Sequence, residues 1–208
     1  MVRTVIYTQR VEIIEEYGER RDCADQRIAD FISACGFVPI PVPNRKELAK
    51  EILLNLNPSG IILTGGNSLM RYGGNAPERD EMDKALIELS INYRIPLYGF
   101  CRGMQSILDY FGNELINVQG HVAVYHSIQE KSDHYKVNSY HQQACMKLKN
   151  NCDLSVLAQS EDGVIEAICH ESLPMIGTMW HPERERQLTV KDVNRVRRLF
   201  GMKNKEKV

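Results

Sequence analysis

The segment that most limits how this chain can fold is Gly-Phe-Cys-Arg-Gly at positions 99–103, which joins two stretches of different character. The apolar run 95–100 is typical of a buried strand, and the residues after 101 have the apolar spacing of a helix. Glycines two residues before and two residues after Cys101 permit a tight strand-to-helix turn, in which a Cβ atom would collide with the adjacent chain. The sequence therefore predicts that Cys101 is held clear of a sheet edge.

This position would suit Cys101 for nucleophilic chemistry. The start of a helix has unpaired N–H groups and the positive end of the helix dipole, and both favour a thiolate over a thiol. The N–H of Arg102 is the nearest donor for an oxyanion formed beside the sulfur. The alternative is a buried structural cysteine that happens to lie between two glycines.

A second short segment, His-Pro-Glu at positions 181–183, supports the hypothesis that Cys101 is a nucleophile. A cysteine hydrolase needs an imidazole that takes and returns a proton, and a carboxylate that holds the imidazole in one tautomer. His181 and Glu183 are two residues apart, and Pro182 fixes the backbone between them. One short segment can therefore supply both groups.

Strand and helix patterns alternate along the first half of the chain. Strands are expected over residues 5–8, 37–42, 61–64 and 95–100, and the prolines in the second of these favour a sheet edge. Helices are expected over residues 24–35 with Gly36 as the terminating glycine, over 44–56 with a capping box of Asn44 and Glu47, and over 77–93. This alternation predicts an α/β fold with a three-layer, doubly wound (flavodoxin-like), mostly parallel sheet that binds ligands at the carboxyl ends of its strands.

Beyond Gly112 the predicted strands are short and separated by polar turns. They cover residues 122–128, 135–138, 154–158, 164–169 and 175–179, a pattern typical of antiparallel strands added to the sheet. Thr189 and Asp192 form an acidic capping box for a last helix. Length and pattern together predict one domain over residues 1–208.

The charge-dense segment 9–21 follows the first strand and is expected to be a polar loop. Its default role is that of a solvated surface. It also follows the carboxyl end of a strand, where doubly wound sheets bind ligands. We therefore regard Tyr17 and Arg20 or Arg21 as candidates for substrate specificity.

The segment 65–77 contains four glycines and has two possible roles. Glycines after a strand can hold a phosphate, but the segment lacks the spacing of either common nucleotide-binding loop. A loop that donates to an oxyanion fits the pattern better. Arg71 in this loop could still contact a phosphate or a carboxylate.

Four histidines, at positions 121, 126, 134 and 141, raise the question of a metal. Their spacings do not repeat on one helix face and no carboxylate pattern accompanies them, so ordinary polar or substrate-facing histidines are favoured. The six cysteines are scattered without a Cys-x-x-Cys pair, which argues against zinc and for reduced thiols. The sequence thus predicts neither a metal nor a cofactor.

Composition excludes several other classes. A net charge of −1 gives no reason to expect nucleic acid or an anionic membrane as a partner. No apolar stretch is long enough for a membrane span, and residues 1–7 read as a strand rather than as a signal peptide. A cytoplasmic protein is expected.

Four motifs in order resemble those of class I glutamine amidotransferases, and within that family those of the free-standing gamma-glutamyl hydrolases of peptidase family C26. They are Ile-Ile-Leu-Thr-Gly-Gly at 61–66, Gly-Phe-Cys-Arg-Gly-Met-Gln at 99–105, Asn-Ser-Tyr-His-Gln at 138–142 and His-Pro-Glu at 181–183. The resemblance runs from the first strand to the last helix. It implies the same α/β fold.

The resemblance also implies roles for particular residues. It implies a triad of Cys101, His181 and Glu183, with the backbone N–H groups of Gly66 and Arg102 as the oxyanion hole. Further residues would hold the glutamyl group: Gln105, one helical turn after the cysteine, and the stretch Ser139, Tyr140 and His141.

The implied reaction is hydrolysis of a γ-glutamyl amide through a thioester, without a cofactor. The substrates suggested by the resemblance are γ-glutamyl-CDP-amidate, used in capsular phosphoramidate synthesis, and next γ-glutamyl-aminobutyrate. The alternative is a glutaminase chain that supplies ammonia to a partner synthetase. A homodimer is also compatible with the sequence, and a binding module without activity is disfavoured because all three triad residues are present.

Overall fold

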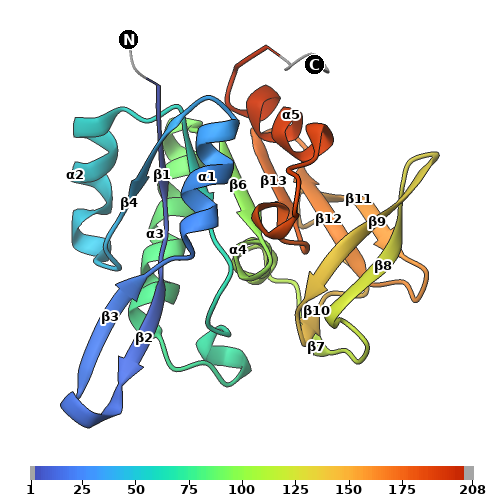
Figure 1. The fold of residues 1–208 in the computed structure, drawn as a ribbon, viewed down its shortest axis with the longest axis horizontal. Helices are drawn as coiled ribbons and strands as arrows, with labels where there is room; N and C mark the ends of the chain where they lie inside the picture. Colours follow the sequence, from blue (N-terminus) through green and yellow to red (C-terminus); the bar gives the residue numbers. More distant parts are fainter. Residues whose placement is uncertain (1–2, 204–208) are drawn as a thin grey trace.

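The computed structural model describes residues 3–203, which form one large sheet with helices on both faces (Figure 1). Within these residues, nine strands lie in the order β4-β1-β5-β6-β13-β12-β11-β8-β9. The parallel strands are β4 (Val38–Pro41), β1 (Thr4–Tyr7), β5 (Gly60–Leu63), β6 (Leu97–Phe100) and β13 (Met175–Thr178). The antiparallel strands are β12 (Ile165–His170), β11 (Leu154–Ser160), β8 (Val122–Glu130) and β9 (Asp133–Tyr140). The predicted α/β fold is confirmed.

Two groups of helices cover the parallel half of the sheet (Figure 1). Helices α1 (Gln26–Ala34) and α5 (Val190–Leu199) cover one face, and α2 (Lys46–Leu56), α3 (Pro77–Tyr93) and α4 (Arg102–Tyr110) cover the other. Side chains of a strand point alternately to the two faces, so Ile62 packs with α1 and α5 while Ile61 and Leu63 pack with the other group. Both faces are buried, which explains why these strands are continuously apolar.

The strand β13 corrects one expectation. The sequence pattern predicts residues 175–179 to be one of the added antiparallel strands. In the structure β13 is antiparallel to β12 but parallel to β6, with Thr178 opposite Phe100. A short apolar run has the same pattern in either direction, so only the pairing decides which part of the sheet it joins.

The two predicted capping boxes have opposite outcomes. Thr189 caps α5 as predicted, because its Oγ1 accepts from the N–H of Asp192 at 3.0 Å. The box of Asn44 and Glu47 is wrong: α2 has Arg45 at its N-cap and no side-chain cap. The amide of Asn44 instead donates to Asp22 Oδ1 at 2.6 Å and to the carbonyl of Gln9 at 3.0 Å.

The segment 9–21, expected to be a loop, is part of a β-hairpin. Strands β2 (Arg10–Ile14) and β3 (Glu19–Cys23) pair antiparallel around the short helix η1 (Glu15–Tyr17), and the hairpin projects from the carboxyl end of β1 (Figure 1). Strand β3 is almost entirely charged, and the apolar residues of β2, which are Val11, Ile13 and Ile14, lie within a charge-dense segment, so the sequence pattern did not reveal the two strands. Opposite charges face each other across the pair, as at Glu12 and Arg21.

The remaining elements are short. They are the paired strands β7 (Ile116–Asn117) and β10 (Gln143–Ala144) and the 3-10 helices η2 (Met70–Tyr72) and η3 (Pro182–Arg184). Among residues 3–203, no helix combines the length and the apolar character that a membrane span requires.

Candidate active site

Three neighbouring parallel strands end at the same edge of the sheet and deliver the candidate catalytic segments. Strand β5 leads into Gly65 and Gly66, β6 leads into Cys101, and β13 leads toward His181. The register places Leu63 opposite Gly99, and Gly99 opposite Gly177, so the three ends are level. This is the edge at which open α/β sheets bind their ligands.

The turn at Cys101 is tight and strained. Cys101 has φ 51° and ψ −112°, outside the regions that L-residues favour. A Cβ atom on Gly99 would lie 2.6 Å from the backbone of Gly103, and one on Gly103 would lie 2.0 Å from the carbonyl oxygen of Leu63. Both glycines are therefore required by the close approach of β5, β6 and α4. Backbone strain of this kind is typical of a functional residue.

His181 is held on both sides by short hydrogen bonds. Its ring Nδ1 lies 2.7 Å from Oε1 of Glu183, and both side chains are buried. Its backbone N–H donates to Oδ1 of Asn138 at 2.9 Å, and the amide of Asn138 donates back to its carbonyl at 2.8 Å. The carboxylate fixes the tautomer of the ring, and Asn138 on β9 fixes the backbone that carries it.

The electrostatic environment favours a charged His181. Burial lowers the pKa of the ring, but the charge of Cys101, a hydrogen bond with its sulfur and the contact with Glu183 together raise that pKa to about 9. A Cβ atom on Gly65 would lie 2.6 Å from Cε1 of His181 and 3.5 Å from Cβ of Cys101. Gly65 thus allows the imidazole and the thiol to pack against the same loop. The arrangement suits an imidazolium beside a thiolate.

The backbone at Gly66 has a conformation that only glycine adopts readily, with φ +129°. A Cβ atom there would lie 2.6 Å from Cβ of Arg10 and 2.7 Å from Nη1 of Arg79. The amide of Asn67 pairs with the backbone of Val11 on β2, donating and accepting at 2.8 Å. The hairpin therefore fixes the loop whose N–H is the candidate oxyanion donor.

Arg79 on α3 supports the same loop from inside the protein. It is fully buried, and its Nη2 donates to the carbonyl of Thr64 at 2.7 Å and to Oγ1 of Thr64 at 2.9 Å. Burial lowers the pKa of its guanidinium to about 9. Sequence reasoning missed Arg79. Arg79 lies three residues before Met82 and seven before Leu86, so helical periodicity places it on the buried face of α3. A charged residue at such a position is the sequence signal that indicates Arg79.

The side chain of Arg102 points away from the thiol, although its backbone N–H begins α4 beside Cys101. The guanidinium is buried and pairs with Asp80 and Asp83 of α3, and its Nη1 donates to Oγ of Ser106 at 3.1 Å. Arg102 thus joins α4 to α3. Only its N–H, which has no partner within the helix by position, is available to an oxyanion.

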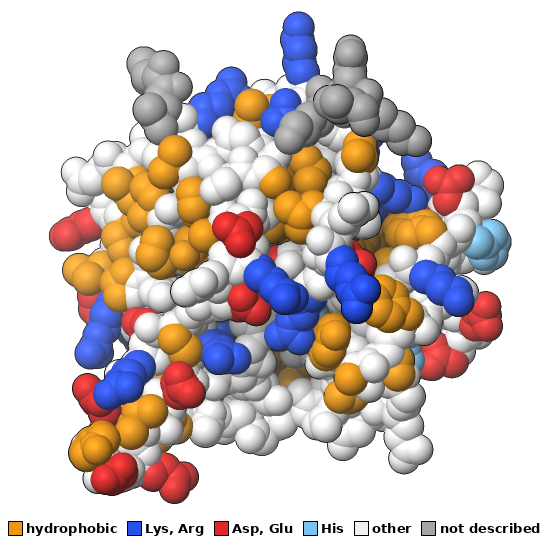
Figure 2. Space-filling model, in the orientation of Figure 1, with side chains coloured by type: hydrophobic (Ala, Val, Ile, Leu, Met, Phe, Trp, Pro, Cys, Tyr) orange, Lys and Arg blue, Asp and Glu red, His pale blue; other side chains and the backbone are white. Residues whose placement is uncertain are grey.

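An open cleft of about 570 Å³ leads to the sulfur of Cys101. It is lined by the hairpin, the oxyanion loop and the residues around His181: Arg10, Val11, Glu12, Ile13, Glu15, Gly66, Asn67, Asn75, Cys101, Tyr140, His181 and Arg184. Figure 2 shows Lys and Arg side chains gathered near the middle of the face that carries α1 and α5. Arg184 stacks on Tyr140, with its guanidinium carbon 4.5 Å from the ring centre. Sequence reasoning missed Arg10 and Arg184, although Arg10 follows a strand end and Arg184 follows the His-Pro-Glu motif.

The other residues selected from the sequence lie in different places. Tyr140 lines the cleft, and its ring centre is 5.6 Å from that of His181. Gln105 is buried and its amide donates to the carbonyl of Gln143 at 2.9 Å. Ser139 is buried and its hydroxyl donates to the carbonyl of His121 at 2.7 Å. Neither of these two side chains is among those that line the cleft.

The candidate specificity residues are also dispersed. Arg20 binds Glu78 through two hydrogen bonds of 2.6 and 2.8 Å, and Arg71 lies 3.3 Å from Asp109 and 3.5 Å from Glu114. Tyr17 is 68% exposed near the tip of the hairpin. The structure does not bring these three residues together around the sulfur of Cys101.

Three of the four histidines considered as a metal cluster do come together. His121, His126 and His141 surround the fully buried carboxylate of Glu166, whereas His134 lies apart on β9. The nearby carboxylate of Glu166 raises the pKa of His121 to about 9 against the effect of its burial, and Asp162 adds to the rise. The imidazole of His141 thus points to Glu166 and is not among the side chains that line the cleft.

The chain is similar in sequence to several known proteins. Residues 21–197 match the family described as Glutamine amidotransferase class-I. A gamma-glutamyl-CDP-amidate hydrolase of Campylobacter jejuni is 31% identical over 188 residues, covering 87% of this chain and 90% of the relative. The glutamine-hydrolysing GMP synthase chain of Pyrococcus abyssi is 32% identical over 153 residues, covering 68% of this chain and 74% of the relative.

A solved structure shows the same fold. The crystal structure of a glutamine amidotransferase of Thermotoga maritima superposes with a TM-score of 0.67 at 18% identity, over 88% of this chain and 77% of that chain. The family match extends over most of the sequence and includes both the turn at Cys101 and the His-Pro-Glu segment. The chain belongs to the class I glutamine amidotransferase family.

Proposed function

We propose that the protein is a cysteine-dependent hydrolase that cleaves a γ-glutamyl amide to glutamate and an amine. The observation that carries this proposal is the buried pair of His181 and Glu183, 2.7 Å apart, with the imidazole beside Cys101 at the floor of an open cleft. A triad of this kind activates a thiol for attack on an acyl carbon.

The first half of the reaction forms a thioester. The Cys101 thiolate attacks the γ-carbonyl carbon, and the N–H groups of Gly66 and Arg102 stabilise the resulting oxyanion. The carbonyl then reforms, the C–N bond breaks, and the departing amine takes a proton from the imidazolium of His181. The γ-glutamyl group is left on sulfur and His181 is neutral.

The second half consumes one water molecule. Neutral His181 removes a proton from the water as its oxygen attacks the thioester carbon, and the same N–H groups stabilise the second oxyanion. Collapse of that intermediate breaks the C–S bond and releases glutamate. The sulfur leaves as a thiolate beside the imidazolium, which restores the starting state. Glu183 holds Nδ1 of His181 throughout.

The leaving group is proposed to carry phosphate. Arg10 and Arg184 line the cleft beside Cys101, and guanidinium groups bind phosphate oxygens in a bidentate fashion. The name of the Campylobacter jejuni relative supports γ-glutamyl-CDP-amidate as the substrate. The role in capsular phosphoramidate synthesis, which the sequence resemblance suggests, is part of the same proposal. We assign the phosphate contacts to Arg10 and Arg184 because they line the cleft, where Arg184 lies 3.7 Å from Oε1 of Glu183. Arg20 and Arg71 do not line it and pair with carboxylates outside it.

The test is glutamate release by the isolated protein from glutamine, γ-glutamyl-aminobutyrate and γ-glutamyl-CDP-amidate at equal concentration. We expect the phosphate-bearing conjugate to have the largest kcat/KM, by at least about tenfold, because binding energy of the leaving group is used in the transition state. Equal rates on all three substrates would contradict the assignment of the leaving group. No glutamate from any of them would contradict the hydrolase itself.

A second candidate is the glutaminase chain of a synthetase, which the Pyrococcus abyssi relative favours. In that case glutamine would be the preferred substrate, and turnover would rise on addition of the ammonia-accepting synthetase. The same assay separates the two functions, because a free-standing hydrolase reaches its full rate without a second protein.

A further inference from the structure

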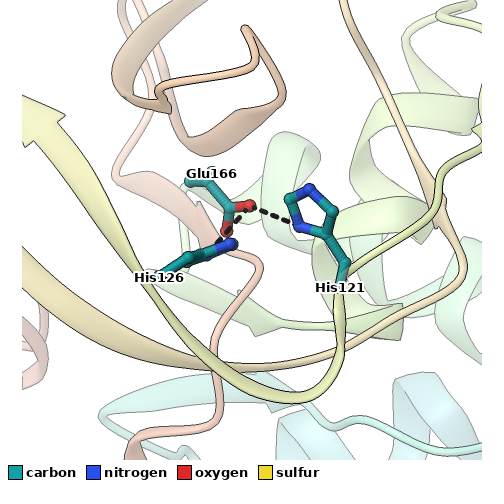
Figure 3. Close-up of side chains that lie close together, drawn as sticks. All are labelled: His121, His126 and Glu166. Atoms are coloured by element: carbon teal, nitrogen blue, oxygen red, sulfur yellow. Dashed lines mark ion pairs between the residues drawn. The ribbon is translucent and has the colours of Figure 1, made fainter.

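The His121, His126, His141 and Glu166 group forms a second buried polar centre in the antiparallel part of the sheet. His121 precedes β8, His126 lies on β8, His141 follows β9 and Glu166 lies on β12. Figure 3 shows the rings of His121 and His126 directed at the carboxylate of Glu166. Strand pairing therefore assembles in space residues that the sequence separates, which is why the spacing of the histidines gave no indication of a site.

The polar atoms that converge in this group have no hydrogen-bond partners. Nδ1 of His121, Nε2 of His126, both nitrogens of His141 and both oxygens of Glu166 are buried and unpartnered. Glu166 is completely buried and His121 and His141 are 3% exposed. A native protein pairs nearly all of its buried polar groups, so a centre with this many unpaired atoms indicates a missing ligand.

The distances indicate what that ligand is. Oε1 of Glu166 lies 3.5 Å from Nδ1 of His121, 3.3 Å from Nε2 of His126 and 3.4 Å from Nε2 of His141. Charged hydrogen bonds between nitrogen and a carboxylate are shorter, about 2.7–2.9 Å. Ligand atoms about 2.0–2.1 Å from a tetrahedral zinc ion lie about 3.3–3.5 Å from one another. The three separations measured from Oε1 of Glu166 have the length of the edges of such a tetrahedron, and the ligand atoms of His121, His126 and Glu166 spread over no more than 4.8 Å.

A carboxylate outside the group orients one of the ligands. Nε2 of His121 lies 2.8 Å from Oδ2 of Asp162, whose other oxygen accepts from the hydroxyl of Ser160 at 2.6 Å. This contact places the proton on Nε2 and leaves the lone pair of Nδ1 directed at Glu166. Histidine ligands of metal ions commonly donate their other N–H to a carboxylate in this way.

We propose that this group binds one Zn²⁺ ion, with His121 Nδ1, His126 Nε2 and Glu166 as ligands and His141 Nε2 as the fourth. The candidate ligand atoms of His121, His126 and Glu166 all lie within 4.8 Å of one another. Imidazole nitrogens with one carboxylate suit zinc, and a divalent cation compensates the charge of the buried Glu166. With four protein ligands the ion has no open position, so its role is structural.

The zinc ion would stiffen one wall of the active-site cleft. His141 follows Tyr140, whose ring packs on His181, and the N–H of His141 donates to the carbonyl of His121 at 2.9 Å. The carbonyl of Glu166 accepts from the N–H of Met179 at 2.8 Å, two residues before His181. Four ligands therefore join β8, β9 and β12 beside the segments that carry Tyr140 and His181.

The experiment is a measurement of metal content in the purified full-length protein, followed by chelation and addition of Zn²⁺ alone. We expect about one zinc ion per chain, a lower Tm after chelation and recovery of the Tm with added Zn²⁺. Cobalt(II) added to the stripped protein should give the visible absorption of a four-coordinate ion. This spectrum tests the ligand set even if a variant does not fold.

Two matched variants identify the ligands. His126→Gln should lower zinc affinity by at least about 10- to 100-fold, whereas His134→Gln, which removes the histidine of β9 outside the group, should leave zinc content and Tm unchanged. Zinc content near zero, with no change of Tm on addition of Zn²⁺, would overturn the proposal and leave a metal-free centre in which a protonated His121 neutralises Glu166. Equal zinc loss in both variants would overturn the assignment of ligands.

Discussion

The protein contains two buried histidine centres, and they differ in how their polar atoms are satisfied. At the candidate catalytic centre, Nδ1 of His181 binds Glu183 at 2.7 Å and the ring also contacts Cys101, so the chain supplies partners on both sides of the imidazole, and Oε2 of Glu183 is the buried atom of this pair without a hydrogen-bond partner. At the centre around Glu166, both nitrogens of His141 lack partners and the histidine-to-carboxylate separations are 3.3–3.5 Å. The first arrangement is suited to proton transfer, whereas the second is suited to holding an ion.

The two centres are nevertheless connected by short segments. Tyr140 lies between Ser139, whose hydroxyl binds the carbonyl of His121, and His141, and its ring packs on His181. The proposed triad and the proposed zinc ligands are thus different residues in neighbouring segments. The following predictions test whether one group determines catalysis and the other determines stability.

The largest effect is expected at Cys101. Cys101→Ala should lower kcat by at least about 10⁴-fold, because no thioester forms without the sulfur. Its zinc content should match that of the wild type, since a smaller side chain fits the turn, whereas its Tm at neutral pH should be lower because the imidazolium of His181 loses its negative partner. Glutamate release, metal content and thermal unfolding measure the three quantities. Cys169→Ala on β12 is the matched control, and activity retained in Cys101→Ala would disprove the mechanism.

The second prediction concerns the orientation of His181. Glu183→Gln should lower kcat by about 10²–10⁴-fold, because an amide no longer stabilises the imidazolium or fixes its tautomer. Steady-state kinetics with the preferred conjugate measures the loss. Glu161→Gln, at an exposed turn between β11 and β12, is the comparison. A kcat for Glu183→Gln equal to that of the wild type would remove Glu183 from the triad.

The third prediction concerns pH and follows from the raised pKa of His181, about 9. The imidazolium is the acid that protonates the amine, so kcat/KM should fall as pH rises through about 9. The pKa in the folded protein lies above the unfolded value, so the contribution of His181 to stability is complete below about pH 6.5 and is lost as pH rises through about 9.

A pH–rate profile and Tm measured against pH check the two statements of this third prediction. In Cys101→Ala the alkaline loss of stability should begin at lower pH, because the negative partner of the imidazolium is gone. An alkaline limb at the same pH in both proteins would show that the thiolate does not set the pKa of His181.

The fourth prediction tests the centre around Glu166. Glu166→Gln should lower the Tm by about 5–15 °C, because it removes a buried charge and a proposed zinc ligand. We expect KM to rise by about 3- to 30-fold with a smaller change in kcat, because the segment that carries Tyr140 into the cleft is held less rigidly. Thermal unfolding and kinetics check these outcomes. A kcat loss as large as that of Cys101→Ala would break the separation between the two centres.

The smallest effect is expected for the basic residues near the leaving group. Arg184→Ala should raise KM for γ-glutamyl-CDP-amidate by about 2- to 5-fold, because a charge pair in contact with solvent contributes up to about 1 kcal/mol, and should change KM for glutamine less. Arg71→Ala is the matched comparison, since Arg71 pairs with Asp109 and Glu114. A larger selective rise in KM for γ-glutamyl-CDP-amidate in Arg71→Ala than in Arg184→Ala would favour the contact between Arg71 and phosphate that the sequence suggested.

Some features of the site were predictable because their residues are neighbours in sequence. Cys101 needs only the glycines two residues away to define its turn, and Glu183 reaches His181 across one proline. The alternation of apolar runs with helical spacing likewise predicted the parallel half of the sheet. Each of these signals depends on spacings of a few residues, where backbone geometry alone decides the outcome.

Other features depended on contacts between distant segments. The hairpin of β2 and β3 lies in a charge-dense segment, and its position is set by the two hydrogen bonds between Val11 and Asn67, 56 residues apart. Asn44 is a residue type that often caps a helix, but its side-chain amide donates to Asp22 instead. In both cases a hydrogen bond to a residue distant in sequence replaced the local structure that the sequence pattern predicted.

The sequence by itself predicted the fold class that the structure shows, and it selected Cys101 and His181 as the candidate nucleophile and base, because these predictions follow from local periodicity and from short motifs. Only the tertiary structure decided which arginine side chains line the cleft and which histidines come together around Glu166. Arg10 and Arg184 reach the cleft while Arg71 does not, and His121, His126 and His141 meet at Glu166 through the pairing of strands. The physical reason is that strand order and register, which no local spacing encodes, set the distances between these side chains.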